Sequence, residues 1–262
     1  MKKILIDNKY LLSTLIKKDI EQRYKGSVLG ILWAILVPLL MLAIYTFVFS
    51  EIFHAKWNIA SDDKYEFAMV LFCGLSAFNM VSEIMSRSTN LIADNTNYVK
   101  KVIFPLELLP VVITFSALFN CVISYAILIL AKLLLTGEVS VTIYQMIILF
   151  IPLCIFCVGI SLNISALSVY LKDIRNVISI LVMILMYISP VFFSLSAVPA
   201  KFRILCEINP MTYIIENFRN VVLYGQNVNV IYFVKSLIIS VGLFIIGSVI
   251  FERTKVGFAD VL

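Results

Sequence analysis

The sequence predicts an all-α integral membrane protein with six transmembrane helices. Of its 262 residues, 61% are hydrophobic and 14% are charged, against about 45–50% apolar and about 25% charged in an ordinary soluble domain. The apolar residues also form runs of the roughly 20 residues that a helix needs to cross a hydrocarbon core of about 30 Å. These runs lack the strict alternation of a transmembrane barrel. Composition and run length therefore exclude a water-soluble enzyme.

Residues 1–27 are predicted to form an amphipathic cytoplasmic interface helix. Leu12, Ile16, Ile20 and Tyr24 recur every four residues, as on one face of a helix. The remaining faces carry charged side chains, namely Lys17, Lys18, Asp19, Glu21 and Arg23. Because a helix of this kind suits the anionic inner leaflet, we expect it to lie flat on the membrane ahead of the first span. The alternative is a cytosolic helix that packs against protein.

Residues 28–262 are predicted to form the transmembrane domain, with both termini in the cytoplasm. The expected spans are residues 28–50, 67–86, 108–131, 143–170, 176–193 and 231–251. In this arrangement seven basic residues precede the first span, and three, two and two lie in later segments on the same side, against six on the other. Basic loops are retained in the cytoplasm, so the sequence predicts an N-in, C-in topology.

Two connecting segments differ from simple loops. The cytoplasmic coupling region, residues 87–105, is expected to hold a short helix at residues 88–95 that docks on a second protein. The gate region, residues 194–229, is external in the predicted topology but largely apolar, and prolines interrupt it. We expect two re-entrant half-helices there, which membranes tolerate where protein or a water-filled cavity surrounds them. Segments of this type border conduction paths.

Isolated polar groups in the spans indicate structural roles. Glu83 lies near the inner end of the second span and is expected to pair with Arg87 one helical turn later, or to reach water. Cys154 and Cys157 form C-x-x-C within a predicted span, where thiols pack like small hydrophobes. His54 has no clustered ligand partners in the sequence, so no metal site is predicted.

Six segments of the sequence have a specific pattern. They are KKDIEQRYKGSVLGILWAILVPLLMLAIYTFVFSEIF (residues 17–53), YVKKVIFPLELLPVV (98–112), YLKDIRNV (170–177), SPVFFSL (189–195), INPMTYIIENFRNVVLYG (208–225) and FERTKVGFADVL (251–262). These segments resemble the permease subunits of ABC-2 type exporters of cell-surface polysaccharides. This family includes O-antigen and teichoic-acid permeases and, more distantly, capsule exporters. Together the six segments extend over nearly the whole chain, from residue 17 to residue 262.

The resemblance implies a homodimer in the bacterial inner (cytoplasmic) membrane that works with two copies of a cytoplasmic ABC ATPase subunit. The cargo would be a polyprenyl-pyrophosphate-linked polysaccharide of the O-antigen type. The sequence holds no G-x-x-x-x-G-K-[ST] motif, which is the usual phosphate-binding loop. We therefore expect no cofactor in this chain, with ATP and Mg bound by the partner subunit, and no enzymatic activity or nucleic-acid binding of its own.

The resemblance also implies roles for particular residues. Contacts with the ATPase subunit are expected at Lys17, Glu21, Asn90, Leu91, Asp94 and Asn95. Aromatic rings on which sugars stack would line a glycan channel at Tyr45, Tyr187, Phe192 and Phe193. The lipid pyrophosphate would meet basic side chains near the inner leaflet, at Arg23, Lys25, Lys100 and Lys101. The external gate would include Pro199, Pro210 and Tyr213.

Two other functions are compatible with the sequence. An ABC-2 permease for another cargo, such as teichoic acid, capsule or a small molecule, would share the fold. A membrane glycosyltransferase acting on a polyprenyl carrier is the alternative from a different class. Such an enzyme would need clustered carboxylates or a basic constellation at one membrane face, whereas the charges here are scattered. The charge pattern therefore favours a transport subunit.

Overall fold

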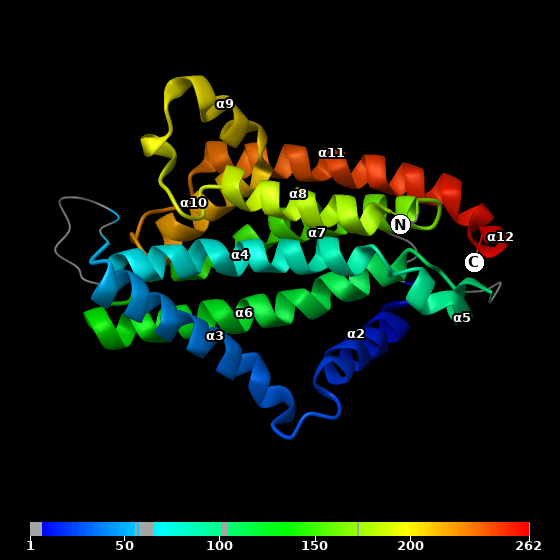
Figure 1. The fold of residues 1–262 in the computed structure, drawn as a ribbon, viewed down its shortest axis with the longest axis horizontal. Helices are drawn as coiled ribbons and strands as arrows, with labels where there is room; N and C mark the ends of the chain where they lie inside the picture. Colours follow the sequence, from blue (N-terminus) through cyan, green and yellow to red (C-terminus); the bar gives the residue numbers. More distant parts are fainter. Residues whose placement is uncertain (1–6, 56, 58–64, 101–103, 172, 262) are drawn as a thin grey trace.

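The computed structural model describes residues 7–55, 57, 65–100, 104–171 and 173–261. Helices contain most of these residues, and none of them lies in a β-strand. Figure 1 shows the chain as a bundle of long helices with shorter helices at both ends. The predicted all-α membrane fold is confirmed at this level.

The helices follow one another along the chain with short connections. The N-terminal half contains α2 (Lys9–Tyr24), α3 (Trp33–Tyr45), α4 (Glu66–Ser88), α5 (Thr96–Val99) and α6 (Leu108–Thr136). The C-terminal half contains α7 (Met146–Ser168), α8 (Ile174–Ile188), α9 (Ala200–Ile208), α10 (Pro210–Val222), α11 (Val230–Thr254) and α12 (Phe258–Val261). A π-helical stretch, Thr46–Ile52, extends α3.

Five helical stretches of the described chain are long and apolar enough to cross a membrane. They are Gly30–Ile52, Glu66–Ser88, Leu108–Thr136, Val141–Ser168 and Val230–Val261. Their positions lie close to five of the expected spans. The chain is therefore an integral membrane protein with several membrane-length helices.

The expected fifth span, residues 176–193, is occupied by the shorter helix α8. Its 15 residues rise about 22 Å, less than a hydrocarbon core of about 30 Å. The helix ends before Pro190 because the residue that precedes a proline favours extended backbone. Ser189 has a ψ of 143°. The expected end at residue 193 is wrong for this reason, and a sixth crossing stays a prediction.

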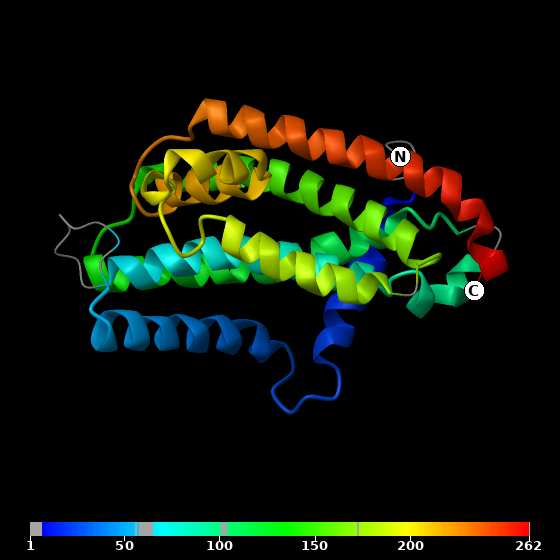
Figure 2. The same ribbon diagram turned by 45° about the horizontal axis from the view of Figure 1, so that its top comes forward.

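The long helices α4, α6, α7, α8 and α11 run side by side along the molecule (Figures 1 and 2). Helix α4 is central, and 78% of its most apolar stretch is buried. It packs against α6, α7, α8 and α10. Helix α3 leans on α6 and α4, but only 11% of its most apolar stretch is buried. The bundle thus has a buried central helix and one weakly covered membrane-length helix.

Glycines allow the closest helix pair, α7 with α11, to approach. A Cβ atom added at Gly247 would lie 2.7 Å from the Gly159 carbonyl oxygen, and one at Gly159 would lie 2.7 Å from the Phe244 nitrogen. Asn163 extends from α7 and donates to the Leu243 carbonyl of α11 at 3.2 Å. In a membrane the hydrophobic effect does not drive helices together, because lipid tails are as apolar as the helix surfaces. Close packing at small residues such as glycine, together with hydrogen bonds between helices, drives their association instead.

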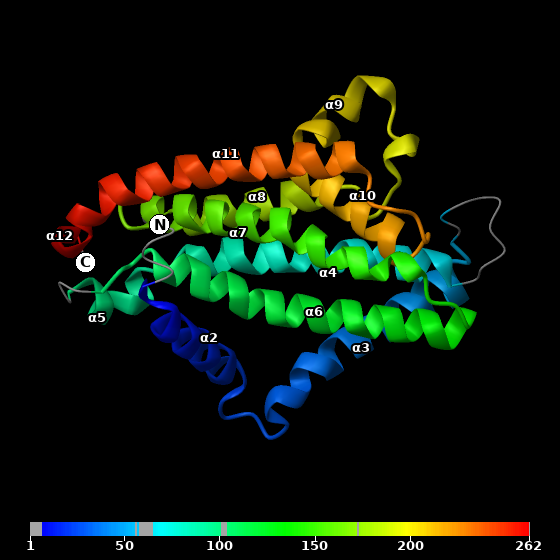
Figure 3. The same cartoon turned by 180° about the vertical axis from the view of Figure 1, so that it is seen from behind.

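The short helices gather at opposite ends of the bundle. The start of α2, α5 and α12 lie at one end, and α9 and α10 lie at the other (Figures 1 and 3). The expected coupling region and both described chain ends therefore share one end, which we call the coupling end. The expected gate region forms the opposite end, which we call the gate end.

Candidate functional site

A polar groove at the coupling end brings α2 next to the coupling region. It has a volume of about 440 Å³ and is lined by Asp19, Gln22, Ser86, Arg87, Asn90, Leu91, Asp94 and Asn95. Four of these residues were expected to contact the ATPase subunit. The other two expected contacts, Lys17 and Glu21, are exposed on α2 and lie 3.9 Å apart as an ion pair outside the groove.

The coupling region differs from the expected helix at residues 88–95. Helix α4 ends at Ser88, and a turn follows in which the Asp94 nitrogen donates to the Asn90 carbonyl at 2.8 Å. Leu91 was expected to contact a partner, but Leu91 and the neighbouring Ile92 are only 6% and 0% exposed. This expectation is wrong because both side chains complete the hydrophobic core. They anchor the segment, and Asp94 remains exposed at its surface.

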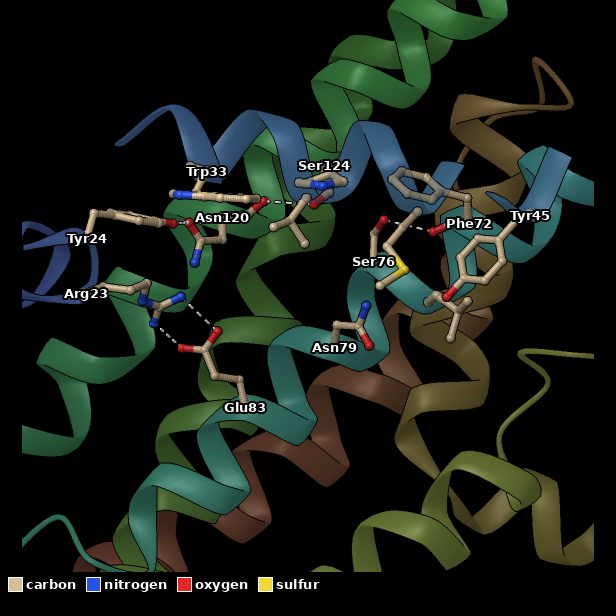
Figure 4. A pocket seen from close by; sticks show the side chains of 15 residues that line it. Arg23, Tyr24, Trp33, Tyr45, Phe72, Ser76, Asn79, Glu83, Asn120 and Ser124 are labelled. Carbon is tan, nitrogen blue, oxygen red and sulfur yellow. Dashed lines mark hydrogen bonds and ion pairs between the residues drawn. The ribbon is translucent and has the colours of Figure 1, made fainter. Parts of the chain in front are cut away.

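A chain of four charged side chains fastens α2 to α4. The Arg23 guanidinium makes two hydrogen bonds to the Glu83 carboxylate (Figure 4), one of them at 3.0 Å. Arg87 donates to Glu83 at 3.4 Å and to Asp19 at 2.6 Å. The expected pairing of Glu83 with Arg87 is therefore present, but Arg23 is the closer partner. We call these four residues the α2–α4 latch.

The latch changes the interpretation of the interface helix. Asp19 and Arg23 were expected on the outer polar faces of α2, yet both are partly buried on the face that carries Leu12, Ile16 and Ile20. This part of the prediction is wrong because complementary charges on α4 draw them inward. The helix packs against α6 by this face. Its position on the membrane surface stays a prediction.

The four expected pyrophosphate residues lie in different environments. Burial alone would lower the pKa of the Arg23 guanidinium, but the hydrogen bonds and negative charge of Glu83 outweigh it and raise the pKa. Arg23 is thus a charged group already held by a carboxylate. Lys25 and Lys100 are exposed at the ends of α2 and α5. Lys101 lies outside the described residues.

The expected channel aromatics lie on two separate elements. Tyr187 and Phe192, 65% and 37% exposed, stack at the end of α8 with ring centroids 6.4 Å apart. Phe193 follows in the same segment and is partly exposed. Tyr45 lies at the end of α3, and its ring centroid is 6.5 Å from that of Phe49. The α8 pair is an open aromatic surface of the kind on which sugar rings stack.

The expected gate region contains two short helices that begin at its prolines. Pro199 caps α9 and is exposed, whereas Pro210 is the first residue of α10 and is buried. Tyr213 is 3% exposed, and its hydroxyl donates to the Glu207 carbonyl at 2.7 Å. Pro210 and Tyr213 therefore fix the break between the helices from inside the protein.

Arg219 is a structural residue of the gate end, although the predicted topology places it among the six basic residues on the external side. It is 0% exposed. Its guanidinium donates to the Val70 carbonyl at 3.3 Å and the Val191 carbonyl at 2.9 Å, and it pairs with Glu216 at 3.1 Å. It also lies 4.6 Å from the centre of the Trp57 ring. Arg219 joins α10 to α4 and to the end of α8.

Lys132 has a similar role on the other side of α10. Its ammonium group donates to the Val222 and Leu223 carbonyls at 3.0 and 2.7 Å, and to the Ser140 hydroxyl at 3.1 Å. Carbonyl groups at a helix C-terminus lack intrahelical donors, and a cation there is favourable. The available signal in the sequence was a lone Lys at the end of a long apolar run.

These features together define a multi-pass α-helical membrane protein with a polar groove at one end and a packed, proline-interrupted cap at the other. The chain belongs to the ABC-2 type transporter family, which matches residues 10–223. The match extends from α2 through α10 and so includes the latch, the groove and both helices of the gate end.

Individual relatives match over most of their own length. The chain is 28% identical over 258 residues to an O-antigen export system permease protein RfbA from Klebsiella pneumoniae, covering 96% of this chain and 95% of the relative. It is 24% identical over 213 residues to RfbA from Myxococcus xanthus, covering 80% and 78%. It is 29% identical to the polysialic acid transport protein KpsM from Escherichia coli, covering 83% of each chain.

Proposed function

We propose that this chain is the permease subunit of an ABC exporter that moves a polyprenyl-pyrophosphate-linked polysaccharide of the O-antigen type outward across the inner membrane. The observation that carries the proposal is the match to polysaccharide export permeases over nearly the whole chain. The named cargo of these relatives is O-antigen or polysialic acid. A separate cytoplasmic ATPase subunit would bind ATP and Mg and supply the energy.

The coupling end supports docking of the ATPase subunit. Its groove combines partly exposed amides and carboxylates from two elements that are distant in the sequence. Leu91 and Ile92 hold the coupling region in the core, so a force applied to Asp94 or Asn90 reaches α4 directly. The latch joins the same helix to α2. ATP-driven movement of the partner would thus shift α2 and α4 together.

Weakly covered apolar helices support the proposed homodimer. Helix α3 exposes Leu39, Leu40 and Ile44, and α8 exposes Ile180, Leu181 and Ile184. In lipid these faces can also contact acyl chains, so exposure alone does not demand a partner. The dimer is favoured because α3 and α8 carry the channel aromatics, and a path for a polymer needs walls from both copies. Six crossings per copy and cytoplasmic termini belong to this proposal.

The ATPase contact is tested by co-purification. We expect Asn90→Trp together with Asp94→Trp to release a co-expressed neighbouring ATPase, because bulky rings fill the groove at exposed or partly exposed positions. Gln226→Trp is a matched control, since Gln226 is exposed at the gate end. Unchanged recovery of the ATPase with the double variant would reject this docking site. ATP turnover by the purified chain alone would reject the division of labour.

The cargo is tested by deletion in the cell. Loss of the chain should remove a surface polysaccharide and leave its lipid-linked form inside, because synthesis continues without export. Complementation by the intact chain is the control. A deletion strain with unchanged surface polysaccharide but altered resistance to small molecules would favour the small-molecule exporter, and transferase activity of the purified chain would favour the enzyme.

A further inference from the structure

A cleft separates α3 from α4 and α6, and of the four expected channel aromatics Tyr45 alone lines it. Its volume is about 470 Å³, which is within the usual range of about 300–1,000 Å³ for small-molecule sites. Figure 4 shows its polar side chains. It extends from the latch at the coupling end to Tyr45 near the end of α3. One side is apolar and comes from α3, and the facing side is polar.

The polar side is a stripe along α4. Ser76, Asn79 and Glu83 are spaced by three and four residues, so they share one face of the helix, and all three line the cleft. Most of α4 around them is buried, yet Asn79 is exposed toward this space. It lies nine residues before the end of α4, about 14 Å along the helix axis. That depth is inside the hydrocarbon region if α4 crosses the membrane.

The amide of Asn79 is an open polar group of the cleft. It makes no hydrogen bond to any other part of the described chain, although an amide can use two donors and one acceptor. Asn163, in contrast, is a span asparagine that is satisfied by two backbone carbonyls. A polar group without partners is costly at membrane depth. Asn79 is thus available to an occupant of the cleft.

Other groups of the cleft offer acceptors at fixed positions. Ser76 donates to the Phe72 carbonyl at 2.8 Å, and Ser124 donates to the Asn120 carbonyl at 3.0 Å. Tyr24 donates to the Asn120 side-chain oxygen at 2.8 Å. Each hydroxyl oxygen that donates in this way keeps lone pairs for a further bond. The wall is therefore a set of neutral donors and acceptors held by local bonds.

The charge of the cleft disfavours an anion. Among the described residues that line it, Arg23 and Glu83 are the ones charged at neutral pH. Their two hydrogen bonds join them as a neutral pair. An anionic group would have to displace the carboxylate from Arg23. Aromatic rings at both ends, Trp33 and Tyr45, add surfaces on which a sugar can stack.

We propose that this cleft binds a neutral sugar unit of a glycolipid, with the Asn79 amide as its principal hydrogen-bonding group. The inference rests on the proposed function, since it names a holding site for the saccharide part of the lipid-linked cargo. The apolar α3 side faces the C–H surfaces of the sugar ring, and the α4 stripe faces its hydroxyl groups. The site lies within one copy of the chain and is separate from the aromatic pair on α8.

The test uses tryptophan fluorescence of the full chain in vesicles. The chain contains two tryptophans, Trp33 in the cleft and Trp57 at the gate end. In a Trp57→Phe background, Trp33 is the reporter. Phosphatidylcholine vesicles are prepared with increasing fractions of digalactosyldiacylglycerol, a neutral glycolipid, or of phosphatidylglycerol, an anionic lipid. We expect a saturable change in Trp33 emission with the glycolipid only.

The role of the Asn79 amide in glycolipid binding is tested with two variants. Asn79→Leu keeps the size of the side chain and removes its polar groups, and we expect glycolipid binding to weaken about five- to tenfold, the effect of one or two neutral hydrogen bonds. Asn79→Gln retains the amide and should bind within about twofold of the parent, because the same hydrogen bonds remain available. Since Asn79 is exposed, both variants should elute like the parent on size-exclusion chromatography.

Three results would overturn the inference. They are an unchanged glycolipid response in Asn79→Leu, a stronger response to phosphatidylglycerol, and no response to either lipid. Failure of the proposed cargo is separable, because this binding requires neither ATPase nor export. A deletion strain with normal surface polysaccharide would reject the cargo while glycolipid binding by the purified chain still stood.

Discussion

The two ends of the bundle hold their charged residues in different ways. At the gate end, Arg219 and Lys132 donate mainly to backbone carbonyls and are 0% and 8% exposed. At the coupling end, the latch pairs side chain with side chain, and its members remain partly exposed. A hydrogen bond to a backbone carbonyl holds a cationic side chain against the main chain. An ion pair near solvent can exchange partners.

This difference suggests a rigid cap opposite an adjustable coupling end. The gate end joins α10, α4 and the segment after α8 through one guanidinium, so its helices should move as one body. The coupling end joins α2 to α4 through bonds that water and a second protein can replace. Surface ion pairs contribute only about 0–1 kcal/mol, whereas breaking a buried charge network costs several kcal/mol.

The largest expected effect follows from removing Arg219. Arg219→Met should destabilise the membrane domain by roughly 3 kcal/mol, because it leaves Glu216 and two carbonyls without their buried donor. Thermal unfolding in detergent, followed by size-exclusion chromatography, measures the loss. Arg175→Met is the matched control, since Arg175 is exposed on α8. Equal stability of the two variants would contradict the rigid-cap interpretation.

Removing Lys132 should have an intermediate effect. Lys132→Met leaves the Val222 and Leu223 carbonyls without this donor, and we expect a loss of about 1–2 kcal/mol. The end of α10 should also exchange its amide hydrogens faster, which hydrogen-exchange mass spectrometry measures. The control is Lys201→Met on exposed α9. Unaltered exchange at residues 219–224 would show that Lys132 is not an anchor.

The smallest effect on stability is expected at the latch. Arg23→Glu should cost about 1 kcal/mol or less, but it places a negative charge beside Glu83 and should detach α2. Release of α2 is measured by accessibility of a cysteine introduced at Leu12, which is partly buried against the core. The charge-swapped pair, Arg23→Glu with Glu83→Arg, should restore protection. If the swap protects no better than the single variant, the pairing does not hold α2.

The partners of Glu83 illustrate what the local sequence can and cannot predict. Its pairing with Arg87 was predictable because four residues make one helical turn. The pairing with Arg23 was not, because the two residues are 60 positions apart. For the same reason, the polar stripe of Ser76, Asn79 and Glu83 was visible in the sequence, but nothing there showed that α3 would leave it uncovered.

The candidate site residues likewise include some whose role was predictable from the sequence and some whose role was not. The prolines that begin α9 and α10 were predictable from backbone chemistry, since proline fixes φ and lacks an N–H donor. The burial of Leu91 was not, because a leucine in a short polar segment can pack against its own core or against a partner. Arg219 was counted as an external charge, whereas three structural elements combine to satisfy it.

The sequence by itself determined that this chain lies in a membrane, where its membrane-length helices are, and to which family it belongs. These properties follow from composition, run length and motifs, which are local along the chain. Only the tertiary structure decided which charges are anchors, which form the latch, and which polar stripe lines the cleft. Those decisions depend on contacts between distant segments, where a buried polar group is stable only if another helix supplies its partner.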